Sequence, residues 1–400
     1  MKRPIDWVRL FAKLYPQVEL PASFFAFLDE QELVGHQIRR ADTKQPLVLF
    51  LKELGIPLSS FSKFLDADSR VKLKLSFPTL LHRPAHEIET YFVQNFSTVF
   101  ALQQIVLDSV ASTGFNRHDK QHVRTVTRRV IELLEWSQIP TKHNRGLKAE
   151  ALIAGYLHDI GNLIGRKEHG LYSIYLLTQL FADLDRDKET QASFIRVLEA
   201  TLFHEVDLGS RFPSLTDLHP ATLGLIIADK SDVSFRRVSA KSNVSDAIKD
   251  AHTLVNLLTA DSQIKCQKKN FQWEIHFSPK VQLDETDQFL ALLKRAERVW
   301  VPDEWQQLYR RANIEYVFIF HATFLRLYFS RLAFAIRSVF ALNPAVETFR
   351  LMINDDERGV SLSRVFSRDD YEAKIALIGN NLFKNVETES RVLSKSNIGE

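Results

Sequence analysis

An adjacent histidine and aspartate, His158 and Asp159, follow the almost wholly apolar segment 149–157, AEALIAGYL. A segment that is apolar on nearly all sides is expected to form a buried central helix, and Gly161 is well placed to end it. A buried aspartate destabilises a fold unless it is paired or binds a metal, and the imidazole beside it has the same need. The pair therefore predicts a divalent cation, because neutral imidazole and carboxylate suit Mn, Fe, Co, Ni or Zn.

Further histidines and aspartates recur in separate predicted helices between residues 106 and 262. His122 lies with Val126 and Val130 at helical spacing, which places it on an apolar stripe that faces the core. Helices are also predicted over residues 171–181, 193–203 and 221–231, and they carry or border His169, His204 and Asp229.

This ordered set resembles the HD-domain superfamily of metal-dependent phosphohydrolases, whose signature is H…HD…D. DKQHVRTV supplies the first histidine, LHDIGN the HD pair and IIADKSDV the closing Asp229. The chain is similar as well to a group of uncharacterised bacterial HD proteins. That similarity lies in YLHDIGNLIGRKEHG, in the Arg237-Val238 that follows ADKSDV, and in the run 329–342 that leads to 351–354. The resemblance covers roughly residues 115 to 358.

The resemblance implies a mainly α fold, with an HD-domain helical bundle, and a phosphohydrolase that uses two divalent ions (Mn, Fe, Co, Ni or Mg). One ion would be held by His122, His158, Asp159 and Asp229, and Asp159 would bridge to a second ion at His169 and His204. Asp159 and Lys230 are the predicted catalytic residues. Lys230 is also the first candidate for a phosphate contact, followed by Arg166, Lys167 and Arg237, for which a solvated surface charge is the competing interpretation.

Two other functions fit the same residues: a mixed-valent di-iron oxygenase of the HD type and a non-catalytic binding module that keeps a structural metal. The HD-GYP phosphodiesterases have a lysine where this chain has Asn162 and a histidine where it has Glu205, so hydrolysis of cyclic dinucleotides is disfavoured. Glu205 stays open between a ligand, a carboxylate that supports a ligand, and an exposed residue. His118 is interpreted as a polar residue at the start of a helix, with a substrate contact as the alternative. His321 is interpreted as a hydrogen-bonded core residue, with catalysis as the alternative.

Residues 1–105 contain no pattern that indicates chemistry, and we expect an accessory or partner-binding region. Helical periodicity covers 7–14, 23–33 and 47–54. The segment 71–77, VKLKLSF, alternates like a strand, and an amphipathic turn is the alternative.

The region 263–385 is predicted to be a small α+β unit. Residues 271–278 and 348–355 alternate with period two, as strands do. We expect these strands to pair in a small sheet that is covered by helices over 286–298 and 318–342.

Composition indicates the cellular compartment and argues against nucleic-acid partners and membrane spans. A single cysteine, Cys266, fits a reducing compartment, and 52 basic against 49 acidic residues are too evenly balanced to indicate nucleic acid as a partner. Charged residues interrupt the longest apolar stretches, so no membrane span is expected. We therefore expect a cytoplasmic protein, and the resemblance to HD proteins implies that it acts on a small phosphorylated substrate, nucleotides included. The aromatic stripe 316–340 is expected to be core or a homodimer face, and 386–400 a flexible tail, with an export signal as the alternative.

Overall fold

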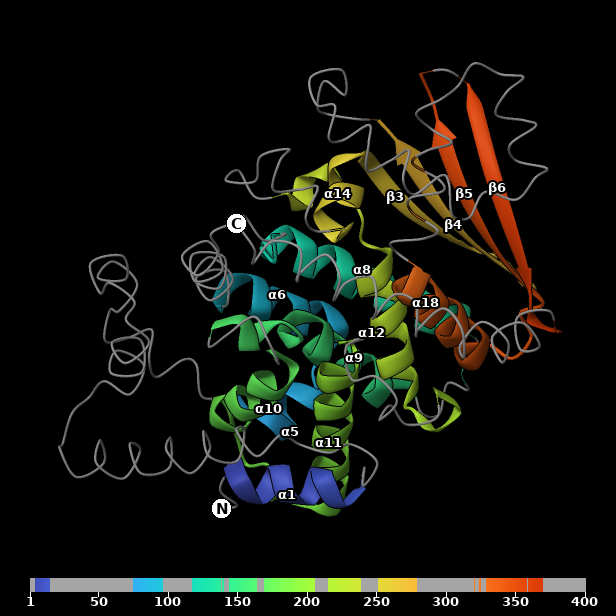
Figure 1. Cartoon of the computed structure of the whole chain (residues 1–400). Coiled ribbons are helices and arrows are strands. Elements are labelled where there is room, and N and C mark those ends of the chain that lie inside the picture. The colour runs from blue at the N-terminus through green and yellow to red at the C-terminus, as the bar shows by residue number, and fades with distance from the viewer. Residues whose placement is uncertain are drawn as a thin grey trace, which may run out of the picture.

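The computed structural model describes residues 4–14, 75–95, 117–137, 139, 144–163, 169–205, 215–238, 251–278, 320, 324, 329–357 and 359–369. In these ranges the chain forms a bundle of helices with a four-stranded sheet at one end (Figure 1). The described part is therefore mainly helical with a small β region, as the sequence predicts. None of its helices is both long and apolar enough to cross a membrane.

The core of the bundle is built by α8 (Lys120–Trp136), α9 (Asn144–Leu157), α10 (His169–Leu180), α11 (Lys188–Phe203) and α12 (Pro220–Ser231). Helix α12 lies in the centre and packs against α8, α9 and α11 (Figure 1). Every residue of α12 after Pro220 is buried, as expected for a helix with apolar residues on nearly all sides. The four helices predicted between residues 149 and 231 are confirmed, with ends that differ by a few residues.

Gly161 does not end α9, so that prediction was wrong. The helix ends at Leu157, and Gly161 lies in the following 3₁₀ turn η3 (Ile160–Leu163). A Cβ at Gly161 would come within 1.8 Å of the carbonyl oxygen of His169. Glycine is therefore needed for close packing between η3 and the start of α10, which brings Asp159 and His169 together.

The N-terminal elements pack on the outside of the bundle. They are α1 (Pro4–Leu14), β1 (Leu75–Ser76), α5 (Phe77–Leu81) and α6 (Ala85–Asn95), and α1 confirms the helix predicted over 7–14. Trp7 of α1 is buried edge-to-face against Phe194 of α11, with ring centroids 5.0 Å apart. Of the predicted strand 71–77, the described part contains only β1, which pairs in parallel with β2 (Phe181–Ala182).

The sheet has the order β3-β4-β5-β6, from β3 (Thr259–Cys266), β4 (Asn270–Phe277), β5 (Thr348–Asp355) and β6 (Val360–Ser367). The predicted pairing of 271–278 with 348–355 is confirmed, and β4 and β5 run parallel with Phe271 opposite Phe349. Strands β3 and β6 were not predicted. They add antiparallel edges, and the boundary placed after residue 262 falls inside β3.

Part of the predicted helix 318–342 is α18 (Phe329–Leu342), which packs against α12 between the bundle and the sheet (Figure 1). Phe320 and Phe324 place their rings against Phe277 and Trp273 of β4, with centroids 5.0 and 5.5 Å apart. The helices predicted over 23–33, 47–54 and 286–298, the residues His321, Arg166 and Lys167, and the tail 386–400 lie outside the described residues.

Candidate metal centre

All six predicted ligands converge in the interior of the helical bundle. They come from the first turn of α8 (His122), the turn after α9 (His158 and Asp159), the start of α10 (His169), the end of α11 (His204) and the last turn of α12 (Asp229). None is more than 8% exposed. Asp119 fixes the start of α8, because its carboxylate accepts hydrogen bonds from the backbone N–H groups of Gln121 and His122 at 3.0 and 3.1 Å.

Asp159 lies at the middle of this cluster, and its two carboxylate oxygens face different histidines. Oδ2 lies 3.4 Å from Nε2 of His122 and 3.0 Å from Nε2 of His158. Oδ1 lies 3.2 Å from Nε2 of His169 and 3.6 Å from Nε2 of His204. On the His122 side, Oδ1 of Asp229 is 3.5 Å from Nε2 of His122. Asp229 thus joins the group formed by His122 and His158.

The other ring nitrogen of each histidine is held from outside the cluster. Nδ1 of His158 and of His204 donates to the carbonyl oxygens of Gly155 and Thr201, at 2.8 and 2.6 Å. Nδ1 of His122 faces Asp232 at 2.6 Å, and Nδ1 of His169 faces Glu205 at 2.9 Å. Histidines that bind metals are usually oriented in this way, by a carbonyl or carboxylate at the second nitrogen.

This arrangement directs unprotonated nitrogens toward one another. A carbonyl oxygen only accepts, so Nδ1 of His204 carries the proton, and Nε2 of the neutral ring has a lone pair. Burial lowers the pKa of His204 to about 4, so its ring is neutral near pH 7. Nε2 of His204 lies 3.1 Å from Nε2 of His169, whose Nδ1 is likewise held by an acceptor. Two facing lone pairs repel each other, so either a proton carried by His169 or a bound cation must lie between these two nitrogens.

His158 has the same need. Its Nε2 is buried, lies 3.0 Å from a carboxylate oxygen of Asp159, and has no hydrogen-bond partner among the described residues. Ligand atoms about 2.1 Å from a shared cation lie about 3.0 to 3.4 Å apart at octahedral or tetrahedral angles. The inward contacts of these histidines span 3.0 to 3.6 Å. The buried histidines and aspartates therefore fit a metal ion, by both their spacing and the chemistry of their donor atoms.

Both central carboxylates are ionised. Burial raises the pKa of Asp159, but the imidazoles of His118 and His158 hold it well below the usual range. Burial also raises the pKa of Asp229, and Lys230 and His122 hold it well below the usual range. Carboxylates with such low pKa values are in the form that binds cations.

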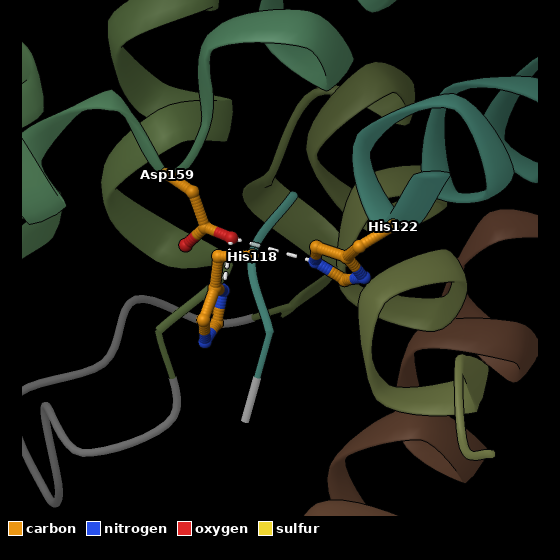
Figure 2. Close-up of side chains that lie close together, drawn as sticks. All are labelled: His118, His122 and Asp159. Carbon is orange, nitrogen blue, oxygen red and sulfur yellow. Dashed lines mark hydrogen bonds and ion pairs between the residues drawn. The ribbon is translucent and has the colours of Figure 1, made fainter. Parts of the chain in front are cut away.

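His118 belongs to the cluster, although the sequence favoured a structural role at the start of a helix. It is 4% exposed, and its Nδ1 lies 2.5 Å from Oδ2 of Asp159 (Figure 2). This contact is too short for two ligands of one cation, and it fits a short, charge-assisted hydrogen bond from the imidazole N–H to the carboxylate. We therefore assign His118 to holding Asp159 in place.

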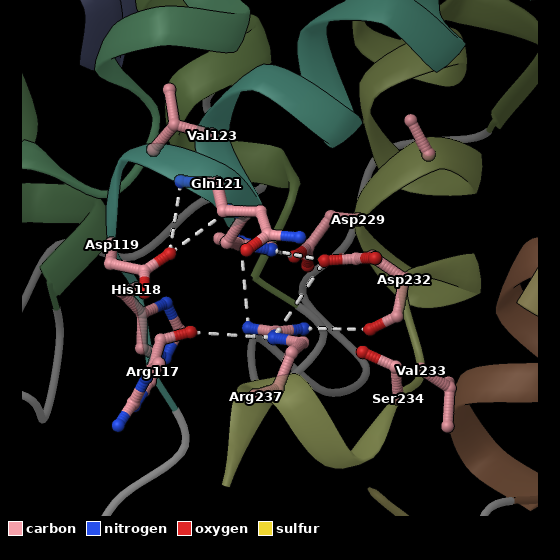
Figure 3. Close-up of polar contacts among 12 residues, drawn as sticks. Arg117, His118, Asp119, Gln121, Val123, Asp229, Asp232, Val233, Ser234 and Arg237 are labelled. Atoms are coloured by element: carbon pink, nitrogen blue, oxygen red, sulfur yellow. Dashed lines mark hydrogen bonds and ion pairs between the residues drawn. The ribbon is translucent and has the colours of Figure 1, made fainter. Parts of the chain in front are cut away.

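Asp232 was not predicted as a functional residue. It accepts from Nδ1 of His122 and is flanked by Arg129 and Arg237, each 3.8 Å away. Figure 3 shows Arg237 beside Asp232. Arg129 also donates to Ser231 and Ser262, which connects α8 with the end of α12 and with β3. The sequence alone does not reveal that Asp232 contacts His122. The two residues are 110 positions apart, and Asp232 follows the end of α12.

The structure describes two of the four predicted phosphate-contact residues, Lys230 and Arg237, and both side chains are buried next to the cluster. Lys230 is 3% exposed and its Nζ lies 2.6 Å from Oδ2 of Asp229, so it borders the cluster. Arg237 is also buried, which rules out the interpretation as a solvated surface charge, and its guanidinium lies 3.4 Å from Nε2 of His122. Arg166 and Lys167 lie outside the described residues.

Glu205, left open by the sequence, supports a histidine. Its carboxylate faces Nδ1 of His169 and accepts from the backbone N–H of Gly170 at 3.1 Å. Burial raises the pKa of Glu205, but the hydrogen bond and the electrostatic contact with His169 lower it to about 2. An ionised carboxylate in this position fixes the orientation of the His169 ring.

Comparisons with models of known protein families, with curated proteins and with solved structures find no match to this chain.

Proposed function

We propose that this chain is a metal-dependent phosphohydrolase of the HD type, with two divalent cations joined by Asp159. The observation that carries the proposal is that the two carboxylate oxygens of Asp159 face separate pairs of histidines. Oδ2 faces His122 and His158, whereas Oδ1 faces His169 and His204. One carboxylate with a separate set of donors at each oxygen is suited to bridging two cations. Two such cations, when bound, polarise a phosphoryl oxygen and lower the pKa of water so that hydroxide forms near neutral pH.

The protein's own residues would hold the ligands and the substrate. Asp232 and Glu205 fix the rings of His122 and His169, and His118 fixes Asp159. Lys230 and Arg237 border the His122 side of the cluster and would contact oxygens of the phosphate. Burial of the whole set excludes bulk water and strengthens each of these electrostatic contacts.

The test combines metal analysis with a substrate screen. The full chain, loaded with manganese or iron, is incubated with phosphorylated metabolites and nucleotides, and phosphate release and oxygen consumption are measured in parallel. We expect phosphate release that His204→Ala abolishes and that the control His86→Ala, at an exposed histidine of α6, retains. Oxygen-dependent turnover with two irons would support the oxygenase instead. Bound metal without turnover of any kind would support a binding module.

A further inference from the structure

A polar pocket of about 420 Å³ lies beside the metal centre, between the start of α8, the 3₁₀ turn η6 (Phe235–Arg237) and β3. Its lining includes His122 of the cluster, together with Asp232 and Arg237, which both contact the His122 ring. The pocket is large enough for a small ligand. Because it shares His122 with the cluster, a ligand in this pocket would lie next to the proposed metals.

The pocket is rich in arginine. The described part of its lining has five arginines, Arg117, Arg128, Arg129, Arg236 and Arg237. Arg128 pairs with Glu132 at 3.5 Å, and Arg129 and Arg237 flank Asp232. Arg117 and Arg236 have no ion pair with any residue that the structure describes. The described lining also holds four carboxylates, Asp119, Glu132, Asp232 and Asp261, which leave the five arginines a net formal charge of +1. Asp119 caps α8, and neither it nor Asp261 forms an ion pair with Arg117 or Arg236 among the described residues.

Arg237 joins the pocket to the metal centre. Its guanidinium donates to the backbone carbonyl of Asp232 at 3.0 Å and approaches the carbonyl of Arg117 at 3.4 Å (Figure 3). The backbone N–H of Arg117 in turn donates to the carbonyl of Arg237. The segment before α8 is thereby fixed to η6, and Arg117 and Arg236 are carried on adjoining backbone.

The lining also limits the kind of ligand. Among the residues that the structure describes, the lining has no phenylalanine, tyrosine or tryptophan, and Ile264 is the one aliphatic hydrophobic residue. Recognition of a nucleobase usually relies on stacking with aromatic rings, and the described lining offers no aromatic side chain for it. A small polyanion suits it better, because guanidinium groups bind phosphate with directed hydrogen bonds.

We propose that this pocket binds a second phosphate group of the substrate, held by Arg117 and Arg236, while the phosphate to be cleaved lies at the metal centre beside Arg237. The substrate class is then a small bisphosphate without a base. This inference rests on the proposed function, because it assigns a substrate class to the same site.

The test compares 1,4-butanediol bisphosphate with the corresponding monophosphate by isothermal titration calorimetry. Both ligands are titrated into the full chain, as purified and after treatment with a chelator. We expect the bisphosphate to bind the wild type at least about tenfold more tightly, as one or two charge-assisted contacts would give. Arg117→Gln/Arg236→Gln should remove this preference, whereas Arg186→Gln, at an exposed arginine outside the pocket, should keep it.

Two outcomes separate this inference from the proposed function. If phosphate is released but the double variant keeps the preference for the bisphosphate, the pocket assignment is wrong and the hydrolase stands. If no phosphate is released but the preference depends on the two arginines in the chelated chain, the pocket stands as an anion site and the hydrolase is wrong. Thermal unfolding checks that the double variant folds, and Arg236→Gln, at an exposed side chain, repeats the measurement if it does not.

Discussion

Nδ1 of His122 lies 2.6 Å from Oδ2 of Asp232, a residue that the sequence places beyond the last turn of α12. The contact holds the ring so that Nε2 faces Asp159 and Asp229. Replacement of such a partner typically weakens metal binding by about 10- to 100-fold.

Asp232→Asn is therefore expected to weaken metal affinity by about tenfold or more, because the amide lacks the negative charge that fixes and polarises the ring. Competition with a chelator of known affinity measures the change. Asp217→Asn, at an exposed aspartate before α12, is the matched control and should bind metal like the wild type. Equal affinities for the two variants would show that Asp232 does not support a ligand.

His204→Ala should lower the metal content from about two ions per chain to about one. It removes a donor on the Oδ1 side of Asp159 but leaves His122, His158 and Asp229 on the other side. Elemental analysis of the purified chain, with His86→Ala as the control, measures the stoichiometry. A wild-type value near one would contradict the proposal of a second ion.

Gly161→Ala should destabilise the fold by at least about 2 kcal/mol, because the new Cβ would overlap the carbonyl oxygen of His169. Gly146→Ala is the contrasting variant. Gly146 lies exposed in α9, and a Cβ added there would meet nothing within 4 Å, so the change should stabilise the helix by about 0.4 to 1 kcal/mol. Chemical denaturation of both variants tests the pair, and equal changes would contradict the close packing assigned to η3.

His219 makes the free energy of unfolding depend on pH. Burial, together with the charge of Arg196, lowers its pKa to about 3 from 6.5. Glu150 lies 3.7 Å away but is already paired with Arg196 at 2.6 Å, so it does not hold a proton on His219. The unfolded chain then binds a proton that the folded chain does not, and stability falls as the pH drops from 6.5 toward 3.

His219→Gln should remove this contribution, which amounts to up to about 2 kcal/mol between pH 7.5 and 5.0 at about 1.4 kcal/mol per pH unit below pH 6.5. Denaturation curves of the two proteins at both pH values measure the difference. Parallel losses of stability would show that His219 is protonated equally in the folded and unfolded chains.

Much of this fold could be predicted because its signals are local. Residues 149–157 are apolar on nearly all sides and β4 and β5 alternate with period two, so the buried helix and the paired strands follow from short segments. Strands β3 and β6 were missed because they lie at the sheet edges, where exposed polar residues weaken the alternation. The role of Gly161 was misread because its close contact is with a helix that begins eight residues later.

The six clustered residues were predictable because each lies in a recognisable sequence context. The residues that hold them were not, since Asp232 meets His122 across 110 positions and His118 meets Asp159 across 41. Such partners are set by helix packing, which carries no fixed spacing along the chain. Arg237 is a third case. The sequence identifies it as a charged residue near the cluster, but only the fold shows that its side chain is buried.

The claim on which this account depends is that Asp159 joins two cations, and the most direct measurement is the metal content of Asp159→Ala beside the wild type. Inductively coupled plasma mass spectrometry should find about two ions per wild-type chain and almost none in the variant, since both groups of histidines lose their shared carboxylate. Circular dichroism must show that the variant is folded. A folded Asp159→Ala chain that still holds two ions would contradict the bridging role.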